Sequence, residues 1–286
     1  MKNGVLLIDK PKGITSRDAV DFVCKRLGTK KVGHVGSLDP FATGLLLITV
    51  NDATKIGSFL ESLDKVYVAE LTLGERRESG DVTTEVVETK DVPILTKAKI
   101  EEVFDSFIGP QKQLPPMYSA LKHQGRPLYK YAREGIEISR EPRDINIYDL
   151  KCLNYTANSI IFICHVSKGT YIRTLGEDLA VKLGTVGYLS NLTRTKVGSF
   201  LLENAIALDS IGEDKMLSIV DVLSHMPTLD ISAATTLKDI KNGRPLSLPS
   251  KEALVFLKNK NLPLAIYEKH SDGLYYSKRG FSSEND

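Results

Sequence analysis

An aspartate between glycines is the residue of this chain best placed to do chemistry. Asp39 lies within residues 33–48, after Gly36 and before Gly44, and an apolar run follows it. Glycine adopts backbone conformations that other residues avoid, and Asp-Pro is a common turn pair. Such a loop can hold a carboxylate rigidly and leave room for a substrate beside it. The local pattern by itself favours an ordinary turn.

An arginine in an electrostatically awkward position is the second candidate. Residues 167–170 connect a predicted strand to a predicted helix with Thr170 as its N-cap, which places Arg173 in the first turn. The helix dipole disfavours a cation there, so Arg173 needs an anion nearby. Pairing with Asp39 would lower the pKa of that carboxyl and orient it, and a phosphate would also serve. A structural ion pair or a solvated arginine is the alternative.

Two further side chains each have a functional and a structural interpretation. Tyr67 begins a predicted strand, where most tyrosines pack with a hydrated hydroxyl. Its ring could instead stack on a base while its hydroxyl handles a proton. His34 precedes Asp39 by five residues, so it either reaches the same cleft or completes a turn.

Residues 112–143 combine basic and aromatic side chains. They contain seven Lys or Arg and three Glu, a net charge of +4, together with Tyr118, Tyr129 and Tyr131. Cations meet phosphates and rings stack on bases, so this composition suits RNA binding, and a solvated helix face is the alternative. Prolines and glycines interrupt residues 110–143. A connection this long without a core predicts a functional insertion.

The sequence does not support metal-dependent or nucleotide-cofactor chemistry. The five histidines show no metal-ligand spacing, and no nucleotide-binding glycine motif follows a strand, so we expect neither a metal nor a cofactor. The net charge of the whole chain is only +2. Three scattered cysteines, an N-terminus unlike a signal peptide and the absence of a run near the roughly 18 apolar residues of a membrane span predict a cytoplasmic protein.

The elements that must position these residues predict an α+β fold. Strands outnumber helices and do not alternate strictly with them, so we expect a mixed sheet with flanking helices. A capping box at residues 15–18 begins the first helix. After Pro227, a helix and a hairpin around residues 271–273 form a small tail that frays from Ser282. The main strands are expected at residues 4–8, 44–50, 67–73, 145–155, 160–166 and 186–192, and further helices at 96–108 and 171–183.

Six motifs in a fixed order resemble the TruB-type tRNA pseudouridine-55 synthases. They are residues 3–13, 33–46, 116–122, 128–133, 167–173 and 188–194. The resemblance implies a cofactor-free and metal-free isomerase that converts a uridine, position 55 in the T-loop of tRNA, to pseudouridine. It also implies a mainly antiparallel sheet of pseudouridine-synthase type. Residues 1–227 would form the catalytic domain, with an insertion at about 110–143 over the cleft, and residues 228–286 a short, divergent, PUA-like RNA-binding domain.

The resemblance implies roles for single residues. Asp39 matches the catalytic aspartate, Tyr67 the tyrosine that stacks on the flipped uracil, and Arg173 the arginine that pairs with the aspartate. Five residues match those that line the pocket, lie near the everted bases or support the catalytic loop: Tyr171, Leu192, His34, Lys10 and Pro11. Base flipping agrees with this set, because stacking on an aromatic ring offsets part of the cost of extruding the base.

Three functions compete at this point. The first is a monomeric tRNA pseudouridine synthase that acts on the T-arm through Asp39. The second is a tRNA-folding chaperone, which can coexist with the first because flipping the base requires the T-loop to open. The third is an unrelated aspartate-dependent hydrolase, which leaves the basic insertion unexplained. The combination of Asp39, Tyr67 and Arg173 favours the enzyme.

Overall fold

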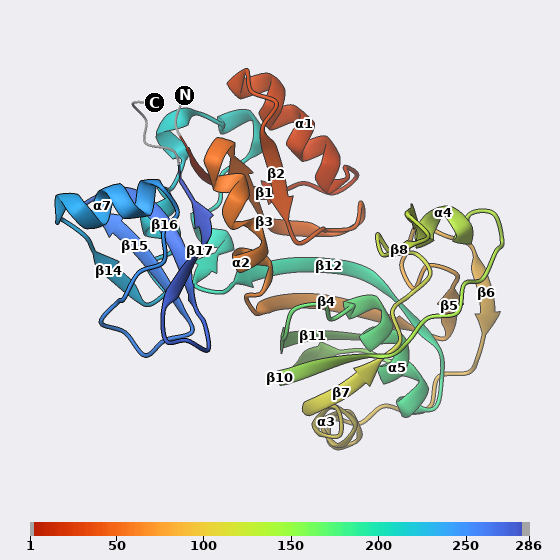
Figure 1. Ribbon diagram of the computed structural model, residues 1–286. Coiled ribbons are helices and arrows are strands. Elements are labelled where there is room, and N and C mark those ends of the chain that lie inside the picture. The colour runs from red at the N-terminus through yellow and green to blue at the C-terminus, as the bar shows by residue number, and fades with distance from the viewer. Residues whose placement is uncertain (1–2, 282–286) are drawn as a thin grey trace.

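The computed structural model describes residues 3–281, in which two main β-sheets of unequal size lie next to each other (Figure 1). The larger sheet has nine strands, with the order β1-β3-β12-β4-β11-β10-β7 along its main path, β2 paired with β3, and β13 paired with β12. Within the described residues its pairings are antiparallel apart from the one between β3 and β12. Its strands are β1 (Gly4–Lys10), β2 (Val32–Val35), β3 (Thr43–Val50), β4 (Lys65–Leu73), β7 (Gly109–Gln113), β10 (Arg143–Tyr155), β11 (Ser159–Val166), β12 (Gly187–Val197) and β13 (Phe200–Leu201).

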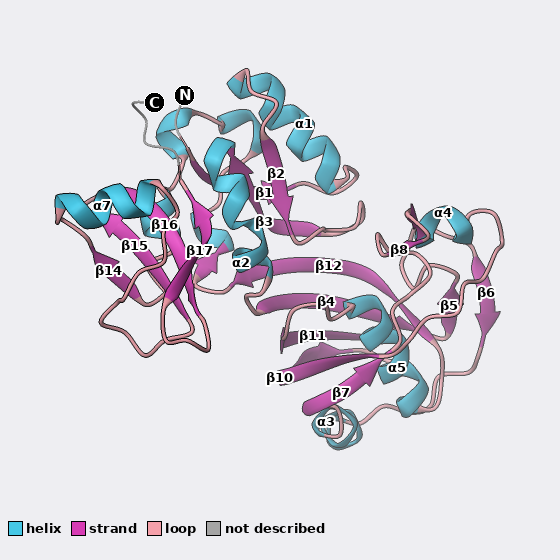
Figure 2. Ribbon diagram, viewed as in Figure 1, coloured by secondary structure: helices cyan, strands magenta, loops and turns pink. Residues whose placement is uncertain are grey.

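Helices pack against the large sheet, which confirms the expected α+β fold (Figure 2). Helix α3 packs on β10, α5 packs on β12 and β4, and α1 packs beside β2. The helices are α1 (Ser16–Leu27), α2 (Gly57–Glu61), α3 (Lys97–Asp105), α4 (Leu128–Ala132), α5 (Ile172–Leu183), α6 (Ile219–Val222) and α7 (Ala234–Lys241).

Local sequence explains where these elements begin and which side they bury. Thr15 forms the predicted capping box with Asp18: the Thr15 hydroxyl accepts from the Asp18 N–H at 3.0 Å, and the Asp18 carboxylate accepts from the Thr15 N–H at 2.8 Å. In β4 every second residue is buried, from Lys65 to Leu73, as its alternating pattern predicts. The apolar strand β11 lies inside the sheet, between β4 and β10.

One short parallel contact joins the two halves of the large sheet. Thr43 and Gly44 of β3 pair with Thr193 and Arg194 of β12. Gly44 has a φ of +98°, and a Cβ atom there would lie 2.4 Å from the carbonyl oxygen of Arg194, so glycine alone fits. Asp39 lies in the loop just before β3. The junction therefore holds that loop beside β12.

The C-terminal residues form the second sheet, whose four strands follow the order β14-β15-β16-β17. A turn at residues 271–273 joins β16 to β17, which confirms the predicted hairpin. Phe256 and Ile266 pack in one apolar cluster with Val5 and Leu7, so the small sheet is held against the large one. The expected fraying from Ser282 lies outside the described residues. The strands are β14 (Thr228–Asp230), β15 (Leu254–Asn259), β16 (Leu262–Lys269) and β17 (Tyr275–Gly280).

A strand that the composition did not predict begins just before the basic residues 112–143 and includes the first two of them. Residues 109–113 form β7, which pairs with β10 through its backbone while carrying polar side chains. The segment without a regular core therefore covers residues 114–142 and not the whole of 110–143. It holds a small hairpin followed by α4, and a second hairpin lies near it (Figure 1). These hairpins are β8 (Lys122–His123) with β9 (Arg126–Pro127), and β5 (Glu75–Arg77) with β6 (Val86–Thr89).

The described part of the chain contains no helix that could cross a membrane. None of the helices within residues 3–281 has both the length and the apolar character that such a span requires.

Substitution of Gly44 tests the junction between the two halves of the sheet. Gly44→Ala is expected to lower the free energy of unfolding by about 2 kcal/mol more than Gly109→Ala does. Both glycines have a φ near +100° (+98° and +103°), but a Cβ at Gly109 meets nothing within 4 Å. Urea denaturation of the two variants measures the difference. Equal losses would show that the close approach to Arg194 does not limit this position.

Candidate active site

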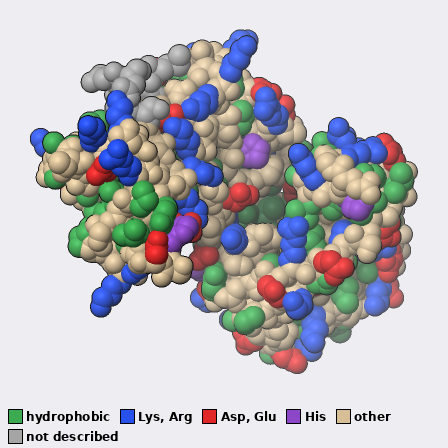
Figure 3. Space-filling model, in the orientation of Figure 1, with side chains coloured by type: hydrophobic (Ala, Val, Ile, Leu, Met, Phe, Trp, Pro, Cys, Tyr) green, Lys and Arg blue, Asp and Glu red, His purple; other side chains and the backbone are tan. Residues whose placement is uncertain are grey.

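A cavity of about 360 Å³ lies at the junction of the two half-sheets, and Asp39 forms part of its wall. The loop before β3, the start of β4, residues 119–121 of the insertion, the start of α5 and β12 all contribute lining residues. Figure 3 shows a hollow on this face between the part of the molecule that carries α1 and β3 and the part that carries β4 and β12. Segments far apart in the sequence thus meet around one carboxylate.

Arg173 holds the Asp39 carboxylate and is itself almost fully enclosed. Its side chain is 4 % exposed, and its Nε donates to Asp39 Oδ2 at 2.8 Å. One terminal nitrogen donates to the Tyr118 carbonyl at 2.6 Å, and the other donates to the Ser79 carbonyl. Asp81 adds a second carboxylate 3.6 Å from Nε. Every nitrogen of the guanidinium therefore has a partner, which fixes its plane.

The pKa of Asp39 is set by two opposing effects. Its side chain is 37 % exposed, but it faces the cavity, and protein surrounds it on its other sides. This burial raises the pKa of the carboxyl, and the nearby Asp81 raises it further, whereas Arg173 lowers it. Burial outweighs the arginine, so the lowered pKa expected from sequence is wrong. Enclosure by protein thus disfavours the charged form of the Asp39 carboxyl, and the ion pair with Arg173 favours it.

The loop that carries Asp39 is clamped by the turn that follows β1. Ser16, 2 % exposed, accepts a hydrogen bond from the Leu38 N–H at 2.8 Å and donates one to the Leu38 carbonyl at 3.1 Å. The N–H of Gly13 donates to the Pro40 carbonyl at 2.7 Å. Both residues that flank Asp39 are therefore tied to residues 13–16.

Lys10 and Pro11 stabilise the turn that holds the Asp39 loop. Lys10 is fully buried, and its Nζ donates to the Pro11 carbonyl at 3.0 Å and to the Ile14 carbonyl at 2.8 Å. These bonds close the turn that leads into Ser16. Burial lowers the pKa of Lys10 to about 8. Neither Lys10 nor Pro11 lines the cavity.

The start of α5 is held by a glutamine that the sequence did not single out. Tyr171, and not Thr170, is the N-cap of α5, and Thr170 instead donates to the Ser167 carbonyl at 2.9 Å. The buried Gln113 accepts from the Tyr171 N–H at 2.8 Å and donates to the Tyr171 carbonyl at 3.0 Å. Gln113 ends β7, so the sheet edge itself positions the first turn that contains Arg173.

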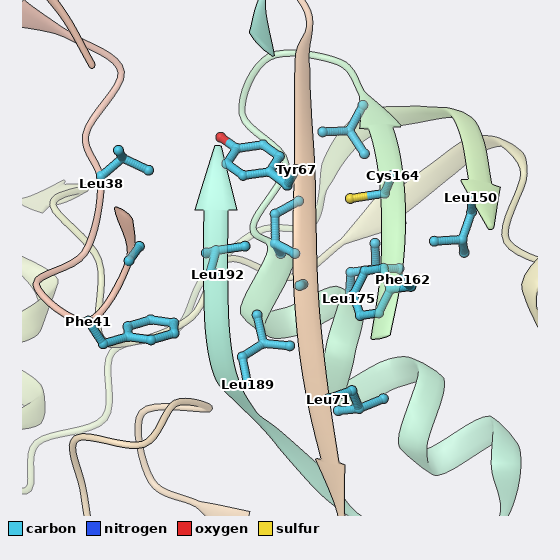
Figure 4. Close-up of a cluster of buried hydrophobic side chains, with 14 of the residues drawn as sticks. Leu38, Phe41, Tyr67, Leu71, Leu150, Phe162, Cys164, Leu175, Leu189 and Leu192 are labelled. Carbon is cyan, nitrogen blue, oxygen red and sulfur yellow. The ribbon is translucent and has the colours of Figure 1, made fainter. Parts of the chain in front are cut away.

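Tyr67 and Leu192 form the apolar side of the cavity. They are 8 % and 5 % exposed, and both belong to the main core cluster. Figure 4 shows the Tyr67 ring close to Leu192, with the tyrosine oxygen at the edge of the apolar cluster. No hydrogen bond joins this hydroxyl to another residue within 3–281. The tyrosine and Asp39 line the same cavity.

Five of the eight residues singled out in the sequence line the cavity: Asp39, Tyr67, Tyr171, Arg173 and Leu192. His34 lies exposed on β2 and is not among the lining residues. Several residues of the site escaped sequence reasoning because their signals are those of ordinary turns and strands: Ser16, Lys65, Ser79, Asp81, Gln113 and Arg194. Asp81 follows Gly80 in a turn, and only the fold shows that the turn faces Arg173.

The part of the chain that the structure describes contains no cluster of potential metal ligands. No group of three or more His, Cys, Asp or Glu side chains there is arranged to hold a metal ion.

A glutamate on α5 lies behind the site. Glu177 follows Arg173 by one helical turn, and its carboxyl carbon would be 3.1 Å from a Cβ atom on Gly80. Burial raises the pKa of Glu177 to about 7, although Arg173 acts in the opposite direction. Ionising this group in the folded protein therefore costs stability.

Glu177→Gln is expected to gain stability relative to the original protein as pH rises from about 5 to about 8. The folded pKa of about 7 exceeds the ordinary 4.5, so the original protein loses stability over that interval while the glutamine variant does not ionise. Thermal melting at both pH values measures the difference. The exposed Glu102→Gln should show no such change, and an equal difference at both pH values would contradict the assignment.

Comparisons with known proteins agree on one family. The model of the TruB family pseudouridylate synthase, N-terminal domain, matches residues 25–172. The chain is 44 % identical over 256 residues to a tRNA pseudouridine synthase B of Hydrogenovibrio crunogenus, covering 88 % of this chain and 84 % of that protein. It is 46 % identical over 211 residues to a tRNA pseudouridine synthase B of Bordetella avium, covering 73 % and 86 %.

Solved structures share the fold. A chain of a Cbf5-Nop10-Gar1 complex matches with a TM-score of 0.71 and 26 % identity, over 93 % of this chain and 78 % of that one. A chain of an H/ACA ribonucleoprotein bound to a substrate RNA matches in fold with a TM-score of 0.74 at 23 % identity, over 99 % and 86 %. The family match and the identity to relatives over most of the chain show that this protein belongs to the TruB family of pseudouridylate synthases.

Proposed function

We propose that this protein converts a uridine of the tRNA T-loop, position 55, to pseudouridine, with Asp39 as the catalytic carboxylate. The observation that carries the proposal is the ion pair of the buried Arg173 with Asp39, in the wall of a cavity that Tyr67 also lines. A volume of about 360 Å³ lies within the range of sites that hold small ligands. We propose further that the protein acts as a monomer, since residues of one chain form the wall of this cavity.

The conversion of uridine to pseudouridine requires one oriented nucleophile and no redox step. The bond from the sugar C1′ to N1 of uracil breaks, the base turns, and a bond from C1′ to C5 forms. The proton on C5 is lost and N1 gains one, so the reaction is an isomerisation. Asp39 attacks the sugar or the base, and Arg173 orients its carboxylate and favours the charged form.

The aromatic side of the cavity offsets the cost of base flipping. Extruding a base costs a few kcal/mol of lost stacking and pairing, and an aromatic face restores part of it. We propose Tyr67, which lines the cavity, as the residue that supplies this face and whose hydroxyl moves a proton. Leu192 and Tyr171 exclude water from the same space.

The insertion is the proposed RNA-binding cover of the site. Ser119, Ala120 and Leu121 line the cavity, so residues 114–142 reach the target base directly. Beyond them, cations already stack on rings: Arg126 lies 4.5 Å from the Tyr131 ring centre and Arg133 lies 5.5 Å from that of Tyr129. Such pairs present both a phosphate ligand and a stacking surface.

The division of the chain at residue 227 belongs to the same proposal. The four-stranded sheet has an apolar cluster of its own, which includes Ile240, Val255 and Tyr275. We propose residues 1–227 as the catalytic domain and residues 228–286 as a PUA-like RNA-binding domain.

Asp39→Asn is expected to reduce pseudouridine formation at least about 10⁴-fold while tRNA binding survives, because the amide keeps the shape but not the nucleophile. Tritium released from C5 of uridine in labelled T-arm RNA measures turnover, and a filter assay measures binding. Asp149→Asn, which alters an exposed pair with Lys151, serves as the matched control. Near-normal turnover by Asp39→Asn would refute the proposal.

Arg173→Lys is expected to lower kcat about 100-fold, with a smaller change in KM. A lysine has one nitrogen and cannot hold Asp39 and the carbonyls of Ser79 and Tyr118 together. The control is Arg76→Lys, which changes an exposed pair with Glu88. If both variants keep the original kcat, the fork of Arg173 does not position the nucleophile.

A further inference from the structure

Three buried cations near the cavity have no carboxylate partner. Lys65 is 6 % exposed, Arg194 is 1 % exposed and Lys10 is fully buried. Within residues 3–281, none of the three forms an ion pair with a carboxylate within 4.0 Å. Lys65 and Arg194 line the cavity, whereas Lys10 lies behind it. Buried charge is expensive unless it is paired, so this arrangement calls for an anion.

Backbone carbonyls hold the two lining cations in place without neutralising them. The Nζ of Lys65 donates to the carbonyls of Glu61 and Leu63, at 2.5 and 2.6 Å. An ammonium has three N–H bonds, so one remains for a further acceptor. Arg194 donates from Nε to the Leu45 carbonyl at 2.7 Å and from Nη2 to the Gly36 carbonyl at 2.9 Å.

The space between these cations is kept open by a glycine. A Cβ atom on Gly36 would lie 3.3 Å from Nη1 of Arg194 and 3.8 Å from Cε of Lys65. The φ of Gly36 is +65°, which also favours glycine. Gly36 lines the same cavity, three residues before Asp39. A group can therefore approach both cations over the bare backbone of the catalytic loop.

The carboxylates of Glu61 and Asp64 favour the charged form of Lys65, but neither forms an ion pair with it within 4.0 Å among the described residues. Glu61 is exposed, lines the cavity and faces Lys65 without forming an ion pair with it. Asp64 lies 3.5 Å from His165, its own partner. Asp39 is engaged by Arg173. The cations of the cavity thus differ in their partners: Arg173 pairs with Asp39, whereas Lys65 and Arg194 line the cavity and donate to backbone carbonyls.

We propose that Lys65 and Arg194, on either side of Gly36, form an anion subsite that binds an RNA phosphate adjoining the flipped uridine. The inference rests on the proposed function, because a nucleotide everted toward Asp39 brings its flanking phosphates to this wall. The planar guanidinium and the ammonium are the side chains best suited to phosphate oxygens. Arg194 is anchored by the sheet, and Lys65 supplies the N–H directed at the substrate.

A double-mutant cycle tests the subsite. In the Asp39→Asn background, affinity is measured for T-arm RNA with native phosphates and for two RNAs with a neutral methylphosphonate on the 5′ or the 3′ side of the target uridine. In the protein that retains Lys65, we expect one of these two replacements to weaken RNA binding about tenfold. In the Lys65→Met variant, the same replacement should weaken binding less than about threefold. Equal losses in both proteins for both RNAs would overturn the subsite.

Two further variants distinguish loss of the phosphate contact from a structural effect of replacing Lys65. Lys65→Arg keeps the charge and should restore the sensitivity to the methylphosphonate, which a merely structural role of Lys65 would not do. Lys97→Met, which removes an exposed lysine on α3, should leave the cycle unchanged. The slope of log affinity against log salt should fall by about 0.7 to 0.9 for Lys65→Met and not for Lys65→Arg.

Failure of the subsite and failure of the proposed function give different results. Turnover of the unmodified T-arm RNA by the protein with Asp39 intact is measured in parallel. Absent turnover refutes the proposed function whatever the cycle shows. Normal turnover with additive losses in the cycle refutes only the phosphate contact of Lys65.

Discussion

A buried guanidinium that must be neutralised is the interaction on which this site depends. Arg173 is 4 % exposed and lies in the first turn of α5, where the helix dipole adds to the cost of its charge. Removing one partner of such a buried pair typically costs about 3–5 kcal/mol. Asp39, Asp81, and the carbonyls of Ser79 and Tyr118 meet that demand together. Four separate segments are thereby drawn around one cavity.

The junction between β3 and β12 supplies the frame for this charge cluster. Its parallel contact at Gly44 holds the Asp39 loop next to the strand that carries Leu192 and Arg194. The clamp of Ser16 on Leu38 then fixes the loop itself. Rigid elements on both sides keep this carboxylate oriented although burial raises its pKa. This is the condition under which a preorganised charge is most effective.

Much of the fold followed from local patterns, and the exceptions have physical reasons. The capping box before α1, the alternation of β4 and the hairpin at residues 271–273 are decided by contacts between near neighbours in the chain. Strand β7 escaped because its side chains are polar and it pairs only through its backbone. Thr170 looked like the cap of α5, but Gln113, 58 residues away in the sequence, satisfies the Tyr171 backbone instead.

The sequence by itself determined the family, the fold class and the residues that face the cavity most directly, because these rest on motifs and on periodicities of two and 3.6 residues. Tertiary structure alone decided the partners. Whether Asp39 has a lowered or a raised pKa depends on how much protein surrounds it, and burial outweighs the arginine. The meeting of Lys65 with Arg194 across Gly36 also depends on strand order, since Coulomb forces follow distance in space and not separation along the chain.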